Sequence, residues 1–268
     1  MGDRAPVSTA RLPAASGLGL AGPFAALGIV LAAWWIIIGL NVVPRAFLPT
    51  PIVVAKGVAE ILTTGGRLRD VRESLLGFAV YYPLAAGLGI AVGLALGLVS
   101  GLGRFMRPLL GFFNAIAGIA WLPLAMMWFG AGTPTVAFVT ANGVFFVVAV
   151  NTLTGVQSVP DTYANGLAVL GASRWRIVRD VLLPGAFPTI LTGLRLALGF
   201  GWRALVAAEM VAAASGLGYL VYRSSYDFRF DIVWAGILLL GFISVTLDRL
   251  LFTPLERWTV ERWGVVHR

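Results

Sequence analysis

The sequence contains no cysteine and a single histidine, His267. The missing thiol excludes disulfides, thiolate metal sites and a cysteine nucleophile. One histidine also gives no basis for a histidine-based catalytic triad or a transition-metal centre. These two absences remove most of the familiar enzyme chemistries from consideration.

Charge is scarce as well: 12% of the 268 residues are charged, whereas 59% are hydrophobic. A soluble domain carries about 25% charged residues, so this chain has too little polar surface to face water on all sides. The net charge of +8 is then typical of basic loops on the cytoplasmic face of a membrane, and nucleic acid is not expected as a partner. The composition predicts a protein of the lipid bilayer.

Six apolar segments reach the roughly 17–25 residues that a transmembrane helix needs. Helices are expected because backbone polar groups must be paired inside the bilayer, and no ten-residue alternating strands suggest a barrel. The expected spans are 20–40, 74–99, 109–130, 134–155, 186–214 and 232–252. The first is too long for the apolar region of a signal peptide. The sequence therefore predicts one all-α transmembrane domain over residues 1–268.

The distribution of arginine predicts the orientation. Arginines precede the first span and follow the second, the fourth and the last, whereas the turn "GAGT" after the third has none. By the positive-inside rule both termini are cytoplasmic, with tails at 1–17 and 253–268. The first external loop departs from this rule, because it carries Arg45, Lys56, Arg67, Arg69 and Arg72. There Asp70 and Glu73 offset part of the charge, and an interfacial helix is expected to lay apolar side chains on the membrane surface: Ile52, Val53, Val58 and Ile61 or Leu62.

Residues 158–184 interrupt the apolar sequence. Ser158 and Asp161 stand at capping-box spacing, and a helical stripe follows, made of Val159, Tyr163, Leu167 and Leu170. Gly171 can take the left-handed conformation that ends this helix. Ser173 can cap a second helix, which Pro184 is expected to end. That helix places Arg176, Arg179 and Asp180 opposite an apolar side made of Trp175, Ile177, Val178, Val181 and Leu182.

Two interpretations of this pair of amphipathic helices are open on physical grounds. The pair is either an interfacial loop whose arginines touch lipid headgroups or an element that docks into a groove of a partner.

Charges within expected spans are costly and mark functional sites by default. The fifth span holds Arg195, Arg203 and Glu209. Arg203, near mid-membrane, is either a cationic element lining a path for an anion or a structural residue, bound to Glu209 of a second copy or to a backbone carbonyl. Glu209 would repel an anion and suits a gate or structural role. Weaker candidates are Asn114, Asn142 and Asn151, because polar side chains also join membrane helices. The four residues predicted for the path or gate are Arg203, Glu209, Asn142 and Asn114.

Gly171, nine residues and then Val181-Leu182-Leu183-Pro184 resemble the cytoplasmic-loop signature of permeases of bacterial ABC importers. That signature reads EAA, three residues, Gly, nine residues, Ile-x-Leu-Pro. This chain has Asn165-Gly166-Leu167 at the first position, so the acidic residue is missing. Three more stretches resemble the branch that handles nitrate, alkanesulfonates and taurine: "FLPTPIVV" (47–54), "WLPLAMMWFGAG" (121–132) and "GWRALVAAEM" (201–210).

The resemblance implies a six-helix type I permease in the bacterial inner membrane. It implies a second copy of the permease, two cytoplasmic ATPase subunits docked on residues 158–184, and a solute-binding protein outside. No G-x-x-x-x-G-K occurs, so ATP and Mg are expected on the ATPase, and the chain itself is expected to be no enzyme and to hold no cofactor or metal. The implied coupling residues are Asn165, Leu167, Gly171, Ser173, Arg174, Trp175, Arg176, Arg179, Leu183 and Pro184.

The substrate stays open. Arg203 favours a small anion such as a sulfonate, taurine or nitrate, while a pyrimidine, a riboflavin-like compound or an aromatic acid are alternatives within the same branch. A stand-alone secondary transporter or channel is a second class; such proteins usually show intramembrane repeats or broken helices, which the sequence does not reveal. A membrane-embedded enzyme is disfavoured because the spans lack a His, Cys or carboxylate cluster.

Overall fold

The computed structural model describes residues 21–41, 44 and 46–263. The predicted tail at 1–17 and the end of the tail at 253–268 lie outside these residues, as does Arg45. Two compact units, Met1–Val53 and Val54–Arg268, make up the chain.

The first unit contains one long helix, α1 (Ala21–Gly39), which carries no charged residue. At 1.5 Å per residue it is about 28 Å long, close to the thickness of the hydrocarbon core. The chain leaves the helix through Asn41, whose φ of 49° lies in the left-handed region that asparagine tolerates better than most residues. The next helix, α2 (Pro51–Thr63), begins after Thr50, whose Oγ1 accepts the Val53 N–H at 3.4 Å.

The second unit is built from helices throughout its described residues. After α2 come α3 (Gly65–Leu98), α4 (Ser100–Ala115), the 3-10 turn η1 (Gly118–Trp121), α5 (Leu122–Phe129), α6 (Thr133–Ser158), α7 (Asp161–Val169), α8 (Arg174–Ile177), the π-turn η2 (Val178–Leu182), α9 (Leu183–Ala212), α10 (Leu217–Tyr226) and α11 (Phe230–Trp263).

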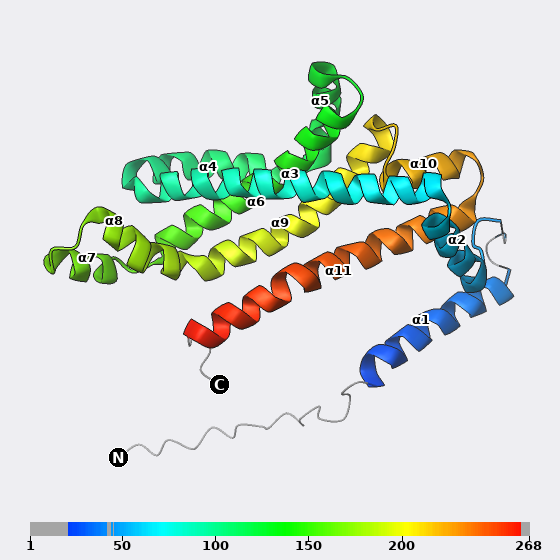
Figure 1. The fold of residues 1–268 in the computed structure, drawn as a ribbon, viewed down its shortest axis with the longest axis horizontal. Helices are drawn as coiled ribbons and strands as arrows, with labels where there is room; N and C mark the ends of the chain where they lie inside the picture. Colours follow the sequence, from blue (N-terminus) through cyan, green and yellow to red (C-terminus); the bar gives the residue numbers. More distant parts are fainter. Residues whose placement is uncertain (1–20, 42–43, 45, 264–268) are drawn as a thin grey trace, which may run out of the picture. The chain divides into compact units, whose positions relative to one another are not determined.

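Helix α6 lies between α3 and α9 and packs against both along their lengths (Figure 1). Small residues allow the close approach. A Cβ at Gly93 of α3 would lie 2.6 Å from the Cβ of Thr152, and one at Gly201 of α9 would lie 2.4 Å from a methyl of Val144. The glycine-rich stretch of α3 is therefore a packing face within the chain, as expected for small residues in membrane helices.

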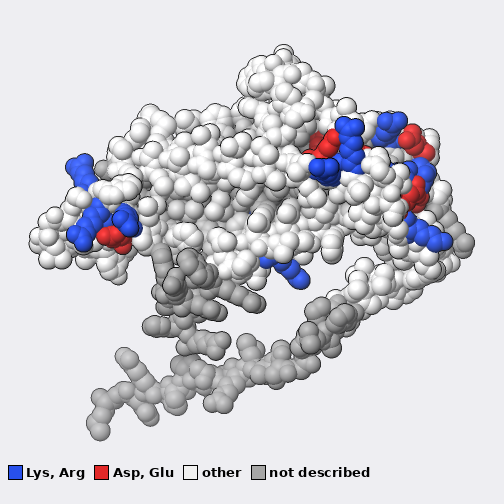
Figure 2. Space-filling model, viewed as in Figure 1, with Lys and Arg blue, Asp and Glu red and all other residues white. Residues whose placement is uncertain are grey.

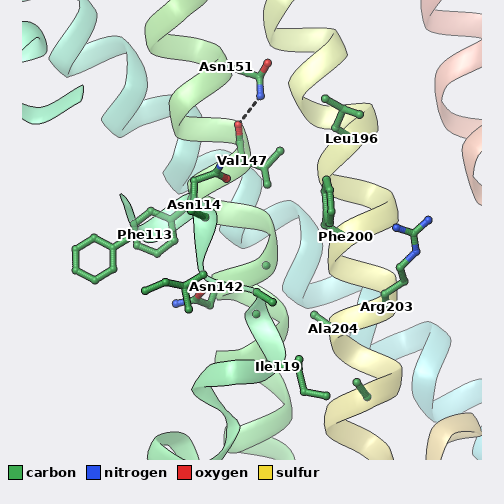
Figure 3. A pocket seen from close by; sticks show the side chains of 17 residues that line it. Phe113, Asn114, Ile119, Asn142, Val147, Asn151, Leu196, Phe200, Arg203 and Ala204 are labelled. Carbon is green, nitrogen blue, oxygen red and sulfur yellow. Dashed lines mark hydrogen bonds between the residues drawn. The ribbon is translucent and has the colours of Figure 1, made fainter. Parts of the chain in front are cut away.

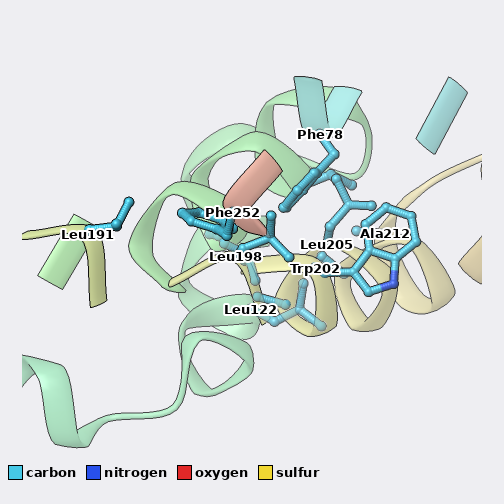
Figure 4. Close-up of a cluster of buried hydrophobic side chains, with 13 residues drawn as sticks. Phe78, Leu122, Leu191, Leu198, Trp202, Leu205, Ala212 and Phe252 are labelled. Atoms are coloured by element: carbon cyan, nitrogen blue, oxygen red, sulfur yellow. The ribbon is translucent and has the colours of Figure 1, made fainter. Parts of the chain in front are cut away.

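The main apolar core joins α3, α5, α6, α9 and α11 (Figure 4). Trp202 is 3% exposed, and its ring meets that of Phe78 edge to face at 5.3 Å between centroids. The indole N–H donates to the Leu240 carbonyl at 3.2 Å, so the one polar atom of this buried ring is satisfied. Phe252 adds a second contact from α11.

Within the part of the chain that the structure describes, four helical stretches are long and apolar enough to cross a membrane: Gly65–Leu98, Thr133–Ser158, Arg174–Ala212 and Phe230–Leu255. A bent pair, Gly101–Ala115 with Gly118–Phe129, counts as a fifth span if taken together, and Ala25–Gly39 of α1 is shorter. Charged side chains gather at two ends of the visible face, with a nearly uncharged band between them (Figure 2). This pattern is that of an all-α membrane protein.

The prediction of one continuous helix over 109–130 is wrong. The chain bends by 87° between α4 and α5, and Ala117 at the bend is extended, with ψ 136°. Pro123 stands in the first turn of α5, where its missing N–H costs nothing and its ring favours the start of a new helix. Apolar composition alone could not reveal this break.

Two of the basic residues of the loop predicted to be external, Arg67 and Arg69, form ion pairs. Arg67 and Arg229 both bind Glu60, the latter at 2.9 Å, and Arg69 binds Glu73 at 2.6 Å. The predicted interfacial face is only partly free, because Ile61 is fully buried. Gly57 explains the packing: a Cβ there would lie 2.8 Å from the Asp231 carbonyl oxygen at the start of α11.

Candidate functional site

A cavity of about 550 Å³ lies where the bend between α4 and α5 meets α6 and α9 (Figure 3). The bend contributes its irregular backbone, α6 contributes Asn142 and Asn151, and α9 contributes Phe200 and Arg203. Irregular backbone at membrane depth is tolerated only where protein buries it or where it lines a water-filled space. The cavity supplies such a space at the break.

Three of the four residues predicted for the path or gate line this cavity: Asn114, Asn142 and Arg203. Among the described residues, no hydrogen bond or ion pair is formed by these three side chains. Arg203 is exposed, and its guanidinium carbon lies over the face of Phe200, 6.0 Å from the ring centroid. Asn151, by contrast, donates to the Val147 carbonyl of its own helix at 2.8 Å.

Glu209, the fourth predicted residue, is absent from the cavity wall. It is 4% exposed and is bound by the Ser74 hydroxyl, 2.7 and 2.8 Å from its two oxygens, and by the Gly218 N–H at 2.9 Å. The structure thus separates Glu209 from Arg203 and joins it to α3 and α10.

The third charge of this span, Arg195, forms a bidentate ion pair with Asp248 of α11, at 2.8 Å for both contacts. Asp248 was not among the predicted site residues. A signal for it exists in the sequence, because it is the only acid between 232 and 252 and an intramembrane acid needs a cationic partner.

The loop 158–184, called here the coupling loop, turns at Gly171 as predicted. Gly171 has φ +80°. The Ala172 N–H donates to the Leu167 carbonyl and the Gly171 N–H to the Ala168 carbonyl, both at 3.0 Å, which is the Schellman arrangement. Ser173 caps the next helix by accepting the Arg176 N–H at 3.4 Å, so this prediction is confirmed.

Two local predictions for the coupling loop are wrong. Ser158 does not form a capping box, because α6 continues through it and its hydroxyl donates to the Gly155 carbonyl at 2.8 Å. Pro184 does not end the second helix, since α8, η2 and α9 run on without a gap. The π-turn Val178–Leu182 directly before Pro184 widens the helix where a proline ring would otherwise meet a carbonyl of the preceding turn.

The tip of the coupling loop exposes apolar side chains: Tyr163 is 64%, Leu170 83% and Trp175 71% exposed. Cationic and polar residues surround them, of which Asn165, Ser173, Arg174, Arg176 and Arg179 are exposed. Arg176 is 3.6 Å from Asp180. Leu167, Leu183 and Pro184 are half-buried at the base of the loop. Of the predicted apolar stripe, Tyr163 and Leu170 are therefore uncovered within this chain's described residues, whereas Val159 and Leu167 are half-buried.

Within residues 21–41, 44 and 46–263 no group of three His, Asp or Glu side chains is placed to hold a metal ion. The described residues thus form two features: a cavity lined by Arg203 and by the carboxamides of Asn114 and Asn142, and a surface loop with exposed apolar side chains.

Residues 85–252 match the family model described as the inner membrane component of binding-protein-dependent transport systems. The matched segment contains the cavity and the whole coupling loop.

Individual relatives agree. The chain is 34% identical to the taurine transport system permease protein TauC of Escherichia coli over 227 residues, which is 83% of this chain and 82% of that one. It is 32% identical to the nitrate import permease protein NrtB of Synechococcus elongatus, over 84% of this chain and 85% of that one. The bicarbonate transport system permease protein CmpB of the same species is 35% identical, over 69% and 66% of the two chains.

A solved structure confirms the fold. A chain of the MetNI methionine ABC transporter, in inward-facing conformations, superimposes with a TM-score of 0.52 at 21% identity, covering 68% of this chain and 94% of that one. The relatives are transport permeases of multi-pass membrane systems, not enzymes. The chain belongs to the family of binding-protein-dependent transport system inner membrane components, and it is the permease subunit of an ABC importer.

Proposed function

We propose that this permease imports a small solute with an anionic group, of the sulfonate, taurine, nitrate or bicarbonate kind, through the cavity beside the α4–α5 bend. One observation carries the proposal: Arg203 lies in the middle of a span, lines the cavity and has no carboxylate partner among the described residues. An intramembrane arginine without a counter-ion is too costly to face lipid. It therefore faces water, and the counter-charge that suits it is the solute.

Glu209 is an unfavourable partner for Arg203 in a salt bridge between two copies. It is buried, and its oxygens already accept hydrogen bonds from Ser74 and Gly218 of its own chain. Asn114 and Asn142 are free to hydrogen-bond a passing oxyanion, because carboxamides can donate as well as accept. The names of the relatives, which include carriers of taurine and nitrate, support the same substrate class.

The coupling loop is proposed to dock on a cytoplasmic ATPase. Exposed Tyr163, Leu170 and Trp175, ringed by arginines, have the composition of an interface hot spot. This role places the α7–α8 end and both termini in the cytoplasm and the α10 end outside. The full assembly is two copies of this permease, two ATPases carrying ATP and Mg, and an external solute-binding protein.

Uptake of labelled anions into proteoliposomes containing the full complex tests the anion proposal. Arg203→Gln should reduce uptake about tenfold or more, since a hydrogen bond to a charged group is worth about 1.5–3 kcal/mol, and Arg203→Lys should keep part of it. Arg69→Gln, which breaks a surface pair, is the matched control. Undiminished uptake by Arg203→Gln, or preference of the wild type for a solute without an anionic group, would contradict the proposal.

A further inference from the structure

Three side chains from other helices hold the first turn of α10. The N–H groups of Gly216, Leu217 and Gly218 donate to Asp70 Oδ1 at 3.1 Å, Ser74 Oγ at 2.7 Å and Glu209 Oε2 at 2.9 Å. The first N–H groups of a helix have no partner within it. Here every one of these three donors is satisfied by α3 or α9, so the start of α10 depends on those two helices.

Ser74 and Glu209 form the centre of this arrangement. The Ser74 hydroxyl donates to the Glu209 carboxylate, with both oxygens within 2.8 Å, and accepts the Leu217 N–H. Ser74 is fully buried and Glu209 is 4% exposed. Asp70, Ser74 and Glu209 are called the latch below. Because a buried carboxylate stripped of donors is very costly, the contacts of the latch are expected to form and break together.

The turn that precedes α10 packs so tightly against Glu209 that it has no room to shift by small steps. Gly216 has φ +115°, and a Cβ there would lie 2.5 Å from the Glu209 carboxyl carbon. A Cβ at Gly218 would lie 2.4 Å from the Val206 carbonyl oxygen. The backbone of the turn therefore rests directly on Glu209 and on the last turns of α9.

Helix α9 connects the latch to the cavity. Glu209 follows Arg203 by six residues, about 9 Å along α9, and Ala204, Leu205 and Ala208 between them are buried in the core. A displacement of the outer end of α9 is thus transmitted to the turn that bears Arg203.

We propose that the latch closes α10 over the outer ends of α3 and α9, that it positions the cavity-lining part of α9, and that it releases when solute enters from outside. The outward direction of α10 rests on the function proposed above. The latch itself concerns residues that line no part of the cavity, and Glu209 acts here as a positioning residue.

A cysteine probe tests release, because the chain has no native cysteine. Ser224→Cys is nearly isosteric and places a thiol on the buried face of α10, where Ser224 is 6% exposed. In the full complex in proteoliposomes, a membrane-impermeant maleimide should label this thiol slowly. Adding Ser74→Ala or Glu209→Ala should accelerate labelling about tenfold or more, because each removes a hydrogen bond that involves a buried charge. Glu209→Gln, which keeps one acceptor oxygen, should give an intermediate rate.

Thr140→Cys separates release of the latch from general loosening. Thr140 is fully buried in α6 and bonds only within its own helix, so it should stay unlabelled in every background. Solute-loaded binding protein with ATP should accelerate labelling of Ser224→Cys in the wild-type background. Unchanged labelling in both latch variants, or equal acceleration at Thr140→Cys, would overturn the proposal. The labelling rate of Ser224→Cys in the latch variants does not depend on which solute is carried. It therefore tests the latch even if the anion proposal fails.

Discussion

Arg195 of α9 and Asp248 of α11 face each other in a bidentate ion pair at 2.8 Å, 53 residues apart in the sequence. The two side chains are 41% and 30% exposed. Together with the Trp202–Leu240 hydrogen bond and Phe252, the pair ties the middle of α11 to the bundle.

Removing one member of this pair should destabilise the permease more than removing both. Arg195→Leu or Asp248→Leu leaves a single charge in the membrane region, whereas the double variant leaves none. We expect a lower thermal midpoint in detergent for each single variant and partial recovery for the double variant. Additive losses in the double variant would show that the two charges do not act as a pair.

Two glycines of α3 offer a matched test of helix packing. Gly93→Ala places a Cβ 2.6 Å from that of Thr152, whereas a Cβ at Gly87 meets nothing within 4 Å. Overpacking costs about 1–3 kcal/mol, so Gly93→Ala should lower the denaturation midpoint. Gly87→Ala should leave it unchanged or raise it slightly, since alanine favours helix. Equal behaviour of the two variants would contradict the α3–α6 contact.

The left-handed turn at Gly171 should be required for coupling. Gly171→Val forces a β-branched residue to φ +80°, which costs about 1–2 kcal/mol and displaces the exposed tip of the loop. Gly166→Ala is the control, because Gly166 is helical and its Cβ position is open. ATP hydrolysis by the complex should lose its stimulation by solute in Gly171→Val and keep it in Gly166→Ala. The opposite ranking would argue against a docking role.

The pH dependence of unfolding in acid should reveal how much the Glu60 ion pairs contribute to stability. The Arg67 guanidinium, by its hydrogen bond to Glu60, lowers the pKa of that carboxyl below its usual range. A lowered folded-state pKa stabilises the protein above the unfolded pKa, and this contribution is lost as the pH falls through the folded pKa. Unfolding followed below about pH 4.3 should therefore be less pH-dependent in Glu60→Gln. Glu60 is 39% exposed, so the effect should be small and should shrink with salt.

Apolar length and capping residues are local properties, and they predicted most of the transmembrane spans and the turn of the coupling loop. Helix α10 was not predicted, and the expected start of α3 and the expected end of α11 differ from those of the structure. Gly171 and Ser173 are examples in which three or four neighbouring residues decide the conformation. The α4–α5 bend was missed because its cause is a change of backbone direction inside an uninterrupted apolar run. Ser158 was assigned to the wrong helix because its spacing to Asp161 suits a cap, while its hydroxyl bonds backward to Gly155.

The candidate site was predicted only in part. Polarity inside an apolar span singled out Arg203, Asn114 and Asn142, which the fold brings to one cavity, and their part in transport stays a prediction. The same criterion singled out Glu209 but could not reveal its surroundings, since Ser74 lies 135 residues away and Asp70 further still. Partners of this kind depend on how helices pack, which sequence spacing does not determine.

The central claim is that this permease moves its solute with energy taken from a partner ATPase through the coupling loop. The most direct measurement is ATP hydrolysis by the reconstituted complex, with and without solute-loaded binding protein, alongside solute uptake in the same vesicles. Loaded binding protein should stimulate hydrolysis, and uptake should stop without ATP. Uptake that proceeds without the ATPase and follows an imposed ion gradient would contradict it.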